Sequence, residues 1–210
     1  MNTIIYSAAA VIAYLVGGVN PAIIISREVY RTDVRRFGSH NPGFTNFKRI
    51  FGNHHAWTVF LVDVFKSALM CALFGWAFEK HMGLFQLGAA YTSMFTLLGH
   101  AYPVWHHFRG GKGVSVMFAA FWFIDWRGAV AAVIVFLIVM FATRYMSLSV
   151  MSAGVGMVAV LFVIGVSHPA VIWFMVFCVA FVIVRHRENI KRIAAGTESK
   201  FSLRSNDKNQ

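Results

Sequence analysis

The chain reads Arg109-Gly110-Gly111-Lys112-Gly113 between two strongly apolar segments, residues 84–104 and 114–124. Glycine can adopt positive φ and lets a ligand approach the backbone closely, and consecutive N–H groups in such a turn can bind an anion. Lys112 and Arg109 add positive charge at the same place. The stretch predicts a phosphate-binding loop at a membrane surface, although a turn that only carries orienting charge would have a similar composition.

This loop is not the Walker A motif of ATP-binding proteins. That motif is Gly-x-x-x-x-Gly-Lys-Ser/Thr, whereas here His106 stands five positions before Gly111 and Lys112 is followed by Gly113. The sequence therefore does not support a nucleotide-binding P-loop fold.

The composition is that of an integral membrane protein. Of the 210 residues, 58% are hydrophobic and 13% are charged, whereas soluble domains carry about a quarter charged residues. The net charge of +11 does not call for a nucleic acid partner, because membrane proteins retain Lys and Arg in cytoplasmic loops. Cys71 and Cys178 lie in apolar runs, so no disulfide framework is expected.

Seven apolar segments could cross a bilayer, which takes about 20 residues for a full span. The first is broken by Gly17-Gly18 and by Asn20-Pro21, and it has the features of a retained span rather than of a cleaved signal peptide. We predict an all-α, polytopic membrane helix bundle that forms one domain over residues 1–198, with a basic, disordered tail over residues 199–210. The predicted segments are 3–25, 55–78, 84–104, 114–124, 128–143, 149–166 and 169–184.

The basic residues set the expected orientation. With the N-terminus outside, sixteen Lys and Arg residues fall on the cytoplasmic side, and two, Lys80 and Arg127, fall outside. This bias predicts an external N-terminus, a cytoplasmic C-terminus and a site at the cytoplasmic surface. Merging the short segments into five spans keeps the N-terminus outside but moves the middle connectors to other sides.

The connector over residues 26–54 is a second candidate for ligand binding. Small hydroxyl and amide residues lie between glycines and basic residues there, which supplies donors without bulk to an anionic ligand. A helix cap needs one such residue, and this connector has four within eight positions. The candidates are Arg35, Gly38, Ser39, Asn41, Gly43, Thr45, Asn46 and Arg49.

Three ionisable residues fall within or at the end of predicted spans. Asp63 and Lys66 lie three positions apart, so they share one helix face, either as a functional pair or as a structural ion pair. His100 ends the third predicted span, where we expect a structural or substrate-positioning role. No His-Glu-x-x-His motif or cysteine pair is present, so no metal site is expected.

The last candidates lie in the second half of the chain. Ser147, in a short connector, could donate to a phosphate or cap a helix. His186 and Asn189 would share one face of a helix that ends before Gly196. Neither a Gly-x-Ser-x-Gly elbow nor a His-x-x-x-x-Asp pattern is present, so these residues alone do not separate an enzyme from a transporter.

Together these residues resemble the bacterial membrane glycerol-3-phosphate acyltransferases that use acyl phosphate, the PlsY family. Residues 38–49 resemble the family's Gly-Ser-Gly-Asn-x-Gly-Ala-Thr-Asn-x-x-Arg. His100 and Pro103, then residues 108–115, resemble His-x-x-Pro followed by Phe-Lys-Gly-Gly-Lys-Gly-Val-Ala. Residues 186–200 resemble His-x-x-Asn-Ile-x-Arg with Gly-Thr-Glu-x-Lys.

The resemblance implies acyl transfer from acyl phosphate to the 1-hydroxyl of sn-glycerol 3-phosphate, which gives lysophosphatidate and inorganic phosphate. It implies no cofactor, metal, coenzyme A donor or obligate protein partner. It also implies a multi-pass protein of the bacterial cytoplasmic membrane with its site facing the cytoplasm. A substrate phosphate is expected to accept the proton, since no general base stands out. The implied catalytic residues are Lys112, Ser39, Arg49, His186 and Asn189, and the implied substrate-binding residues are Gly38, Asn41, Gly43, Thr45, Asn46, Gly110, Gly111, Gly113, Ser147, His100 and Arg35.

Two departures from the family pattern leave alternatives open. His40 and Phe44 stand where the family prefers Gly and Ala, which would suit a divergent paralogue with another acceptor, or an inactive homologue. A transporter or binding protein for a phosphorylated solute is the competing class. It is supported by the broken first span and by the Asp63 and Lys66 pair.

Overall fold

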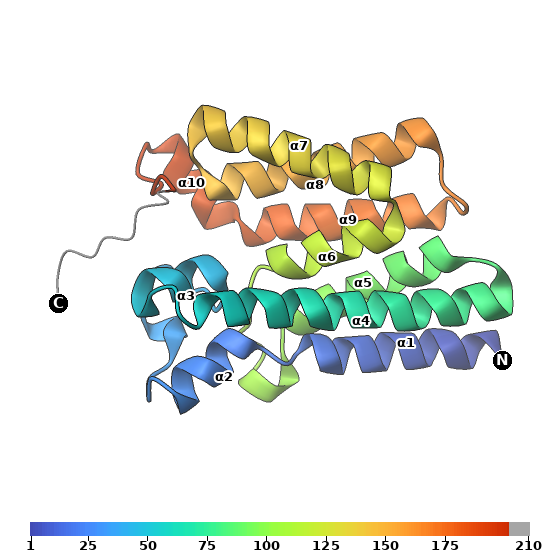
Figure 1. Ribbon diagram of the computed structural model, residues 1–210, viewed down its shortest axis with the longest axis horizontal. Coiled ribbons are helices and arrows are strands. Elements are labelled where there is room, and N and C mark those ends of the chain that lie inside the picture. Colours follow the sequence, from blue (N-terminus) through green and yellow to red (C-terminus); the bar gives the residue numbers. More distant parts are fainter. Residues whose placement is uncertain (202–210) are drawn as a thin grey trace.

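All seven apolar segments predicted from the sequence form helices in the structure, a computed structural model (Figure 1). The structure describes residues 1–201, and these contain helices and turns but no strand, which confirms the all-α class for this part of the chain. The elements are α1 (Asn2–Gly17), α2 (Pro21–Glu28), η1 (Val34–Arg36), α3 (Phe44–Phe51), α4 (Ala56–Met82), α5 (Phe85–Ala101), η2 (Val104–His106), α6 (Val114–Ile124), α7 (Trp126–Thr143), α8 (Met146–Ile164), α9 (Ala170–Arg185) and α10 (Arg187–Ala194).

Length and composition identify four stretches that can cross a membrane. They are α1 with α2, then α4, α7 and α8, and a fifth arises if α9 and α10 count as one span bent by 56°. Helix α5 has 17 residues and α6 has 11. At about 1.5 Å per residue, α6 is about 17 Å long, roughly half the apolar thickness of a bilayer. The architecture is that of a multi-pass membrane protein, while seven spans stays a prediction.

The predicted break in the first span separates α1 from α2. Asn20 caps α2 by accepting a hydrogen bond from the Ile23 N–H at 3.1 Å, and Pro21 takes the first helical position, where its missing N–H costs nothing. Helix α1 packs directly on α5, because a Cβ added at Gly99 would lie 2.0 Å from the Tyr14 carbonyl oxygen. Glycine thus allows backbone contact between these two helices.

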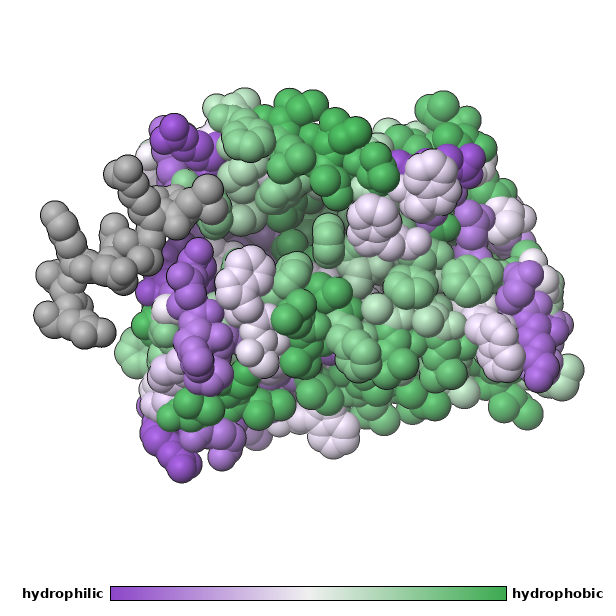
Figure 2. Space-filling view, in the orientation of Figure 1, coloured by the Kyte–Doolittle hydropathy of each residue, from purple (hydrophilic) through white to green (hydrophobic). Residues whose placement is uncertain are grey.

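The bundle has two groups of helices (Figure 1). Helices α1, α4 and α5 lie together, α7, α8 and α9 lie together, and α6 lies between the groups. Helices α2, α3 and α10 gather at the end opposite the N-terminus. Figure 2 shows an apolar band between two hydrophilic ends, one of which carries α2, α3 and α10. The connectors predicted to bind a ligand therefore lie at one end of the bundle.

The start of the predicted disordered tail makes contacts with the rest of the protein. The Phe201 N–H donates to the Arg144 carbonyl oxygen at 2.8 Å, and the Arg49 guanidinium donates to Ser199 Oγ at 3.2 Å. Residues 202–210 lie outside the described residues, so disorder there stays a prediction.

Candidate functional site

A cavity of about 1990 Å³ extends from the α3 and α10 end into the space between the two helix groups. One part is lined by polar and cationic side chains from the connectors. The other part is lined by apolar side chains of α4, α6, α7, α8 and α9, among them Phe60, Phe121, Ala132, Phe136 and Val182. A cavity with these two parts suits a ligand that has both an anionic group and a hydrocarbon chain.

The cavity brings together thirteen of the sixteen predicted site residues. Arg35, Gly110 and Gly111 are the three that do not line it. The thirteen are Gly38, Ser39, Asn41, Gly43, Thr45, Asn46, Arg49, His100, Lys112, Gly113, Ser147, His186 and Asn189.

The first connector is folded by Asn46, a predicted ligand-binding residue that is 1% exposed. Its Oδ1 accepts the Ser39 N–H at 2.9 Å, and its Nδ2 donates to the Phe37 carbonyl oxygen at 3.1 Å. Gly38 has φ of +60°, and a Cβ there would lie 2.4 Å from Asn46 Oδ1. The amide group of Asn46 therefore shapes the loop, in which Ser39 lines the cavity.

His40, which departs from the family pattern, has an unusual backbone conformation. His40 has φ of +57°, a left-handed conformation that glycine adopts without strain but that costs other residues about 1–2 kcal/mol. Its ring nitrogen Nδ1 lies 3.0 Å from the Arg35 carbonyl oxygen. This hydrogen bond offsets part of the strain at a position where the family prefers Gly.

The glycine loop does not form the predicted anion-binding nest at Gly110 and Gly111. Their N–H groups donate to the carbonyl oxygens of Ala101 and His100 at 3.0 and 3.1 Å. A sequence shows that these glycines are free to turn but not which carbonyl their amides will face. Both residues serve to fold the loop.

The element of this loop that could hold an anion is instead the N-terminus of α6. Gly113, with φ of +85°, is its N-cap residue, and no side chain caps the helix. Val114 and Ser115 in the first turn line the cavity beside Lys112. Free N–H groups and the helix dipole favour an anion at such a terminus, and the Lys112 ammonium adds a full charge.

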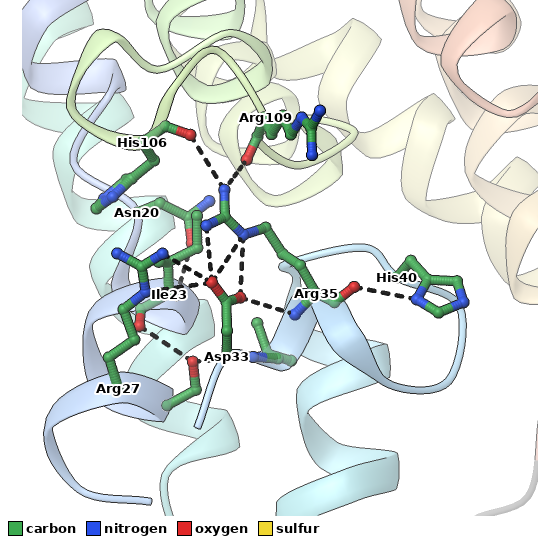
Figure 3. A network of polar contacts seen from close by, with 10 residues as sticks. Asn20, Ile23, Arg27, Asp33, Arg35, His40, His106 and Arg109 are labelled. Atoms are coloured by element: carbon green, nitrogen blue, oxygen red, sulfur yellow. Dashed lines mark hydrogen bonds and ion pairs between the residues drawn. The ribbon is translucent and has the colours of Figure 1, made fainter. Parts of the chain in front are cut away.

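Arg35 contacts the glycine loop (Figure 3). Its Nη1 donates to the carbonyl oxygens of His106 and Arg109 at 3.1 and 2.9 Å. Asp33 pairs with Arg35 and Arg27 at 2.7 and 2.8 Å, and the hydrogen bond from Arg35 holds the pKa of Asp33 well below its usual value. The guanidinium of Arg35 therefore joins the two connectors in this structure, and its phosphate-binding role stays a prediction.

Lys112 lies in a polar cluster with α10. Its Nζ donates to Asn189 Oδ1. Burial, followed by repulsion from Arg192 and Arg185, outweighs attraction to Glu198 and lowers the pKa of Lys112 to about 8. The ammonium is thus mostly charged at neutral pH and loses its charge at mildly alkaline pH.

Glu198 is the centre of this cluster and was not among the predicted site residues. Its carboxylate accepts from Ser147 Oγ at 2.8 Å, from Asn189 Nδ2 at 2.6 Å and from Arg192 Nε at 2.7 Å. Burial raises the pKa of Glu198, but the hydrogen bonds outweigh it and keep the pKa below its usual value. The carboxylate is therefore ionised and lies among the cations that face the cavity.

His186 presents one defined nitrogen to its surroundings. The residue is 4% exposed, and its Nδ1 lies 2.8 Å from the Val182 carbonyl oxygen. A carbonyl only accepts, so Nδ1 carries the proton and Nε2 is left as an acceptor. The imidazole can therefore accept a hydrogen bond from a hydroxyl group in the cavity.

Sequence reasoning missed three further residues of this site. Glu198 and Arg192 lie within the third motif, and their place in that motif was a signal that could have assigned them. Arg185, at the end of α9, donates from Nη2 to the Gly110 and Gly111 carbonyl oxygens at 3.2 and 3.1 Å. No pattern in the sequence indicated this contact across 75 residues.

Comparisons with known proteins show the family of this chain. A family model described as glycerol-3-phosphate acyltransferase matches residues 7–196. Glycerol-3-phosphate acyltransferases of Finegoldia magna and Paraburkholderia phymatum are 31% and 38% identical to this chain. The alignments cover 95% and 91% of this chain, and 98% and 90% of the relatives.

Solved structures of an integral membrane glycerol 3-phosphate acyltransferase, PlsY (YgiH), have the same fold. Its glycerol 3-phosphate form matches with a TM-score of 0.85 and 30% identity, over 94% of this chain and 96% of that one. Its lysophosphatidic acid form matches with a TM-score of 0.80 and 29% identity, over 94% and 95% of the two chains. The resemblance seen in the three motifs is confirmed, and this membrane acyltransferase belongs to the glycerol-3-phosphate acyltransferase family.

Proposed function

We propose that the enzyme transfers an acyl chain from acyl phosphate to the 1-hydroxyl of sn-glycerol 3-phosphate, giving lysophosphatidate and inorganic phosphate. The observation that carries this proposal is the single cavity in which a cationic, donor-rich part continues into an apolar part. Acyl phosphate and lysophosphatidate each combine a phosphate with a hydrocarbon chain. The structural relative has been solved in glycerol 3-phosphate and lysophosphatidic acid forms, which supports the acceptor and the product.

Two phosphates would bind at different places in the polar part. Lys112 and the N-terminus of α6 would hold one of them, since they combine a charge with free backbone donors. Arg49, Ser39 and Thr45 line the cavity on the side of the first connector and would hold and orient the other substrate. Arginine suits this role because its guanidinium can bind a phosphate through two hydrogen bonds.

The acyl chain would lie along α7 in the apolar part. The lining residues of α7 run from Leu137 to Ala129, a rise of about 12 Å at about 1.5 Å per residue. Ala129 and Ala132 are 1% and 3% exposed, and Gly154 of α8 lines the same part. These small side chains leave room for a chain between the two helix groups.

The reaction would proceed by attack of the 1-hydroxyl oxygen of glycerol 3-phosphate on the acyl carbonyl carbon. A new C–O ester bond forms, the C–O bond to phosphate breaks, and inorganic phosphate leaves with the bonding pair. His186 Nε2 would accept a hydrogen bond from the attacking hydroxyl, and a substrate phosphate would take the proton. Lys112 and the N-terminus of α6 would stabilise the charge on the leaving phosphate.

The membrane placement follows from charge. We infer seven spans, an external N-terminus and a cavity that opens to the cytoplasm, because α2, α3 and α10 lie at the end that carries most of the Lys and Arg residues. In a bacterium this means the cytoplasmic membrane, where the charged acceptor comes from the water and the donor chain from the bilayer.

A transporter for a phosphorylated solute would place its substrate at broken helices near the middle of the membrane. Helix α1 breaks from α2 at residues 18–20, but among the described residues this break does not contribute to the cavity lining. The acyltransferase therefore accounts for the cavity better. A paralogue that uses another acceptor would show donor-dependent phosphate release with a different alcohol.

The test is release of phosphate by purified protein from palmitoyl phosphate, with and without glycerol 3-phosphate. Acceptor-dependent release that is lost in Lys112→Ala, and retained in a Lys80→Ala control at the exposed end of α4, would support the proposal. No release by the wild type across several lipids and detergents would overturn it.

A further inference from the structure

A buried charged cluster forms part of the cavity wall, which Asp63 and His100 line, and it has no part in the reaction described above. Asp63 and Lys66 of α4 are 1% and 5% exposed. The Lys66 Nζ lies 2.7 Å from Asp63 Oδ1, 2.7 Å from the Val19 carbonyl oxygen and 3.2 Å from His100 Nδ1. Burying two charges is costly even when they pair, and apolar residues of similar volume are often at least as stable. Stability alone therefore does not explain why these two charges are buried.

One side of this cluster reaches the first connector. Val19 lies in the break between α1 and α2, next to Asn20, which is 0% exposed. Asn20 Nδ2 donates to the Pro42 carbonyl oxygen at 3.3 Å. Pro42 lies between Asn41 and Gly43, two residues of the cavity lining. The contact of Lys66 with the helix break thus fixes the backbone to which the first connector is attached.

The other side reaches the glycine loop. Asp63 Oδ1 lies 3.4 Å from His100 Nδ1. The His100 ring packs against Gly111, where an added Cβ would lie 2.2 Å from Nε2, and the His100 carbonyl oxygen accepts the Gly111 N–H at 3.1 Å. Lys112 follows directly in the chain. The same two side chains of α4 therefore support both loops that face the cavity.

We propose that Asp63 and Lys66 are positioning residues, which set the distance between the first connector and the glycine loop through Asn20 and His100. This role rests on the proposed function, in which each loop holds one substrate. Transfer then requires that the hydroxyl of one substrate meets the carbonyl carbon of the other. A displacement of about 1 Å between two reactants can cost about 100-fold in rate.

The first test is the double variant Asp63→Asn/Lys66→Met, which removes both charges at similar volume, so that no unpaired charge remains buried. We expect it to fold, with kcat per folded enzyme about 100-fold lower and KM for both substrates within about threefold. Hydrogen exchange in a peptide covering residues 110–113 should be faster, because the Ala101 and His100 carbonyl oxygens that accept the Gly110 and Gly111 amides would be held less firmly. Thr92→Val is the matched control, since Thr92 is buried in α5 and its Oγ1 has no hydrogen-bond partner in the part of the chain described.

A second variant avoids buried charge altogether. In Asn20→Ser the serine can still cap α2 but is too short to reach the Pro42 carbonyl oxygen. We expect faster exchange over residues 38–46, unchanged exchange over residues 110–113, and kcat about tenfold lower than in the wild type, a smaller loss than in the double variant because only one loop is released.

The outcomes separate this inference from the proposed function. Wild-type kcat and unchanged exchange in the folded double variant would overturn the positioning role, as would lower activity that only follows the amount of folded protein. If the double variant does not fold, unchanged kcat and exchange in Asn20→Ser overturn it. If the wild type releases no phosphate, the proposed function fails, whereas the exchange measurements still test whether the cluster holds both loops.

Discussion

Raising the pH from 7 to 9 should lower kcat/KM, because the side chain of Lys112 loses its charge in this range. The pKa of Lys112 is lowered to about 8, first by burial and then by repulsion from Arg192 and Arg185. The charged fraction of a group with this pKa is about 91% at pH 7 and about 9% at pH 9, a ratio of about ten. The second pKa of a phosphate ester is about 6, so the charge on the acceptor hardly changes over this range. We therefore expect kcat/KM to fall about tenfold, or about 1.4 kcal/mol.

The direction of this effect depends on which protonation state of Lys112 binds phosphate. The protonated ammonium attracts phosphate, and the neutral amine, which dominates above pH 8, does not. A bound phosphate raises the pKa of Lys112 by attraction, so the loss should appear in kcat/KM, which reports the free enzyme, more than in kcat. The assay is acceptor-dependent phosphate release, with the acceptor-free rate subtracted at each pH to remove hydrolysis of the donor.

Two variants make the result decisive. In Lys112→Arg the guanidinium stays charged throughout this pH range, so the decline between pH 7 and 9 should disappear even if the maximal rate is lower. In Lys112→Ala, kcat/KM should be low at both pH values. A flat wild-type profile, or the same decline in the arginine variant, would refute the assignment of the phosphate-binding charge to Lys112.

Three further predictions concern other parts of the cavity. His186→Ala should lower kcat about 10- to 100-fold, less than Lys112→Ala does, since an acceptor is lost but no charge; an equal loss in the two variants would contradict this assignment. His40→Gly should keep kcat/KM within about threefold. It should change the free energy of unfolding by less than about 1 kcal/mol, because relief of the left-handed strain offsets one lost hydrogen bond. A loss of activity above tenfold would show that the imidazole contacts the substrate. Ala132→Phe should shift preference from palmitoyl toward lauroyl phosphate about 15-fold, because displacing two buried methylenes of the longer chain at about 0.8 kcal/mol each costs about 1.6 kcal/mol. Ile134→Phe, at a position that is 51% exposed on the same helix, should leave the preference unchanged.

The sequence predicted the helices well because their signals are local. Long apolar runs predicted α1, α2 and the helices from α4 to α9, whereas α3 lies in a stretch that was treated as a connector. Asn20-Pro21 predicted a break in the first span and Gly196 predicted the end of a helix, and the structure contains both. The short α6 was identified as apolar but could not be assigned as a full span, because its 11 residues cross a bilayer only if neighbouring helices cover its ends. Length and hydropathy contain no information about such cover.

The site was predicted by residue type but not by contact. Thirteen of the predicted residues line one cavity because charge, small size and motif order mark them in the sequence. Arg35 and Gly110 are residue types that are common in phosphate-binding loops. The hydrogen bonds of the Arg35 guanidinium and of the Gly110 N–H nevertheless go to other residues of this protein. Contacts of this kind join positions 74 residues apart, and one sequence does not show which of two nearby arginines will face inward.

Glu198 has a consequence for the cavity between one turnover and the next. Its carboxylate already neutralises part of the charge of Lys112 and Arg192 when no substrate is present. The cavity therefore attracts free anions less strongly than the same cations would without Glu198. A phosphate bound by Lys112 would therefore lie near a fixed negative charge. This arrangement would favour release of the product over tight retention of the anion.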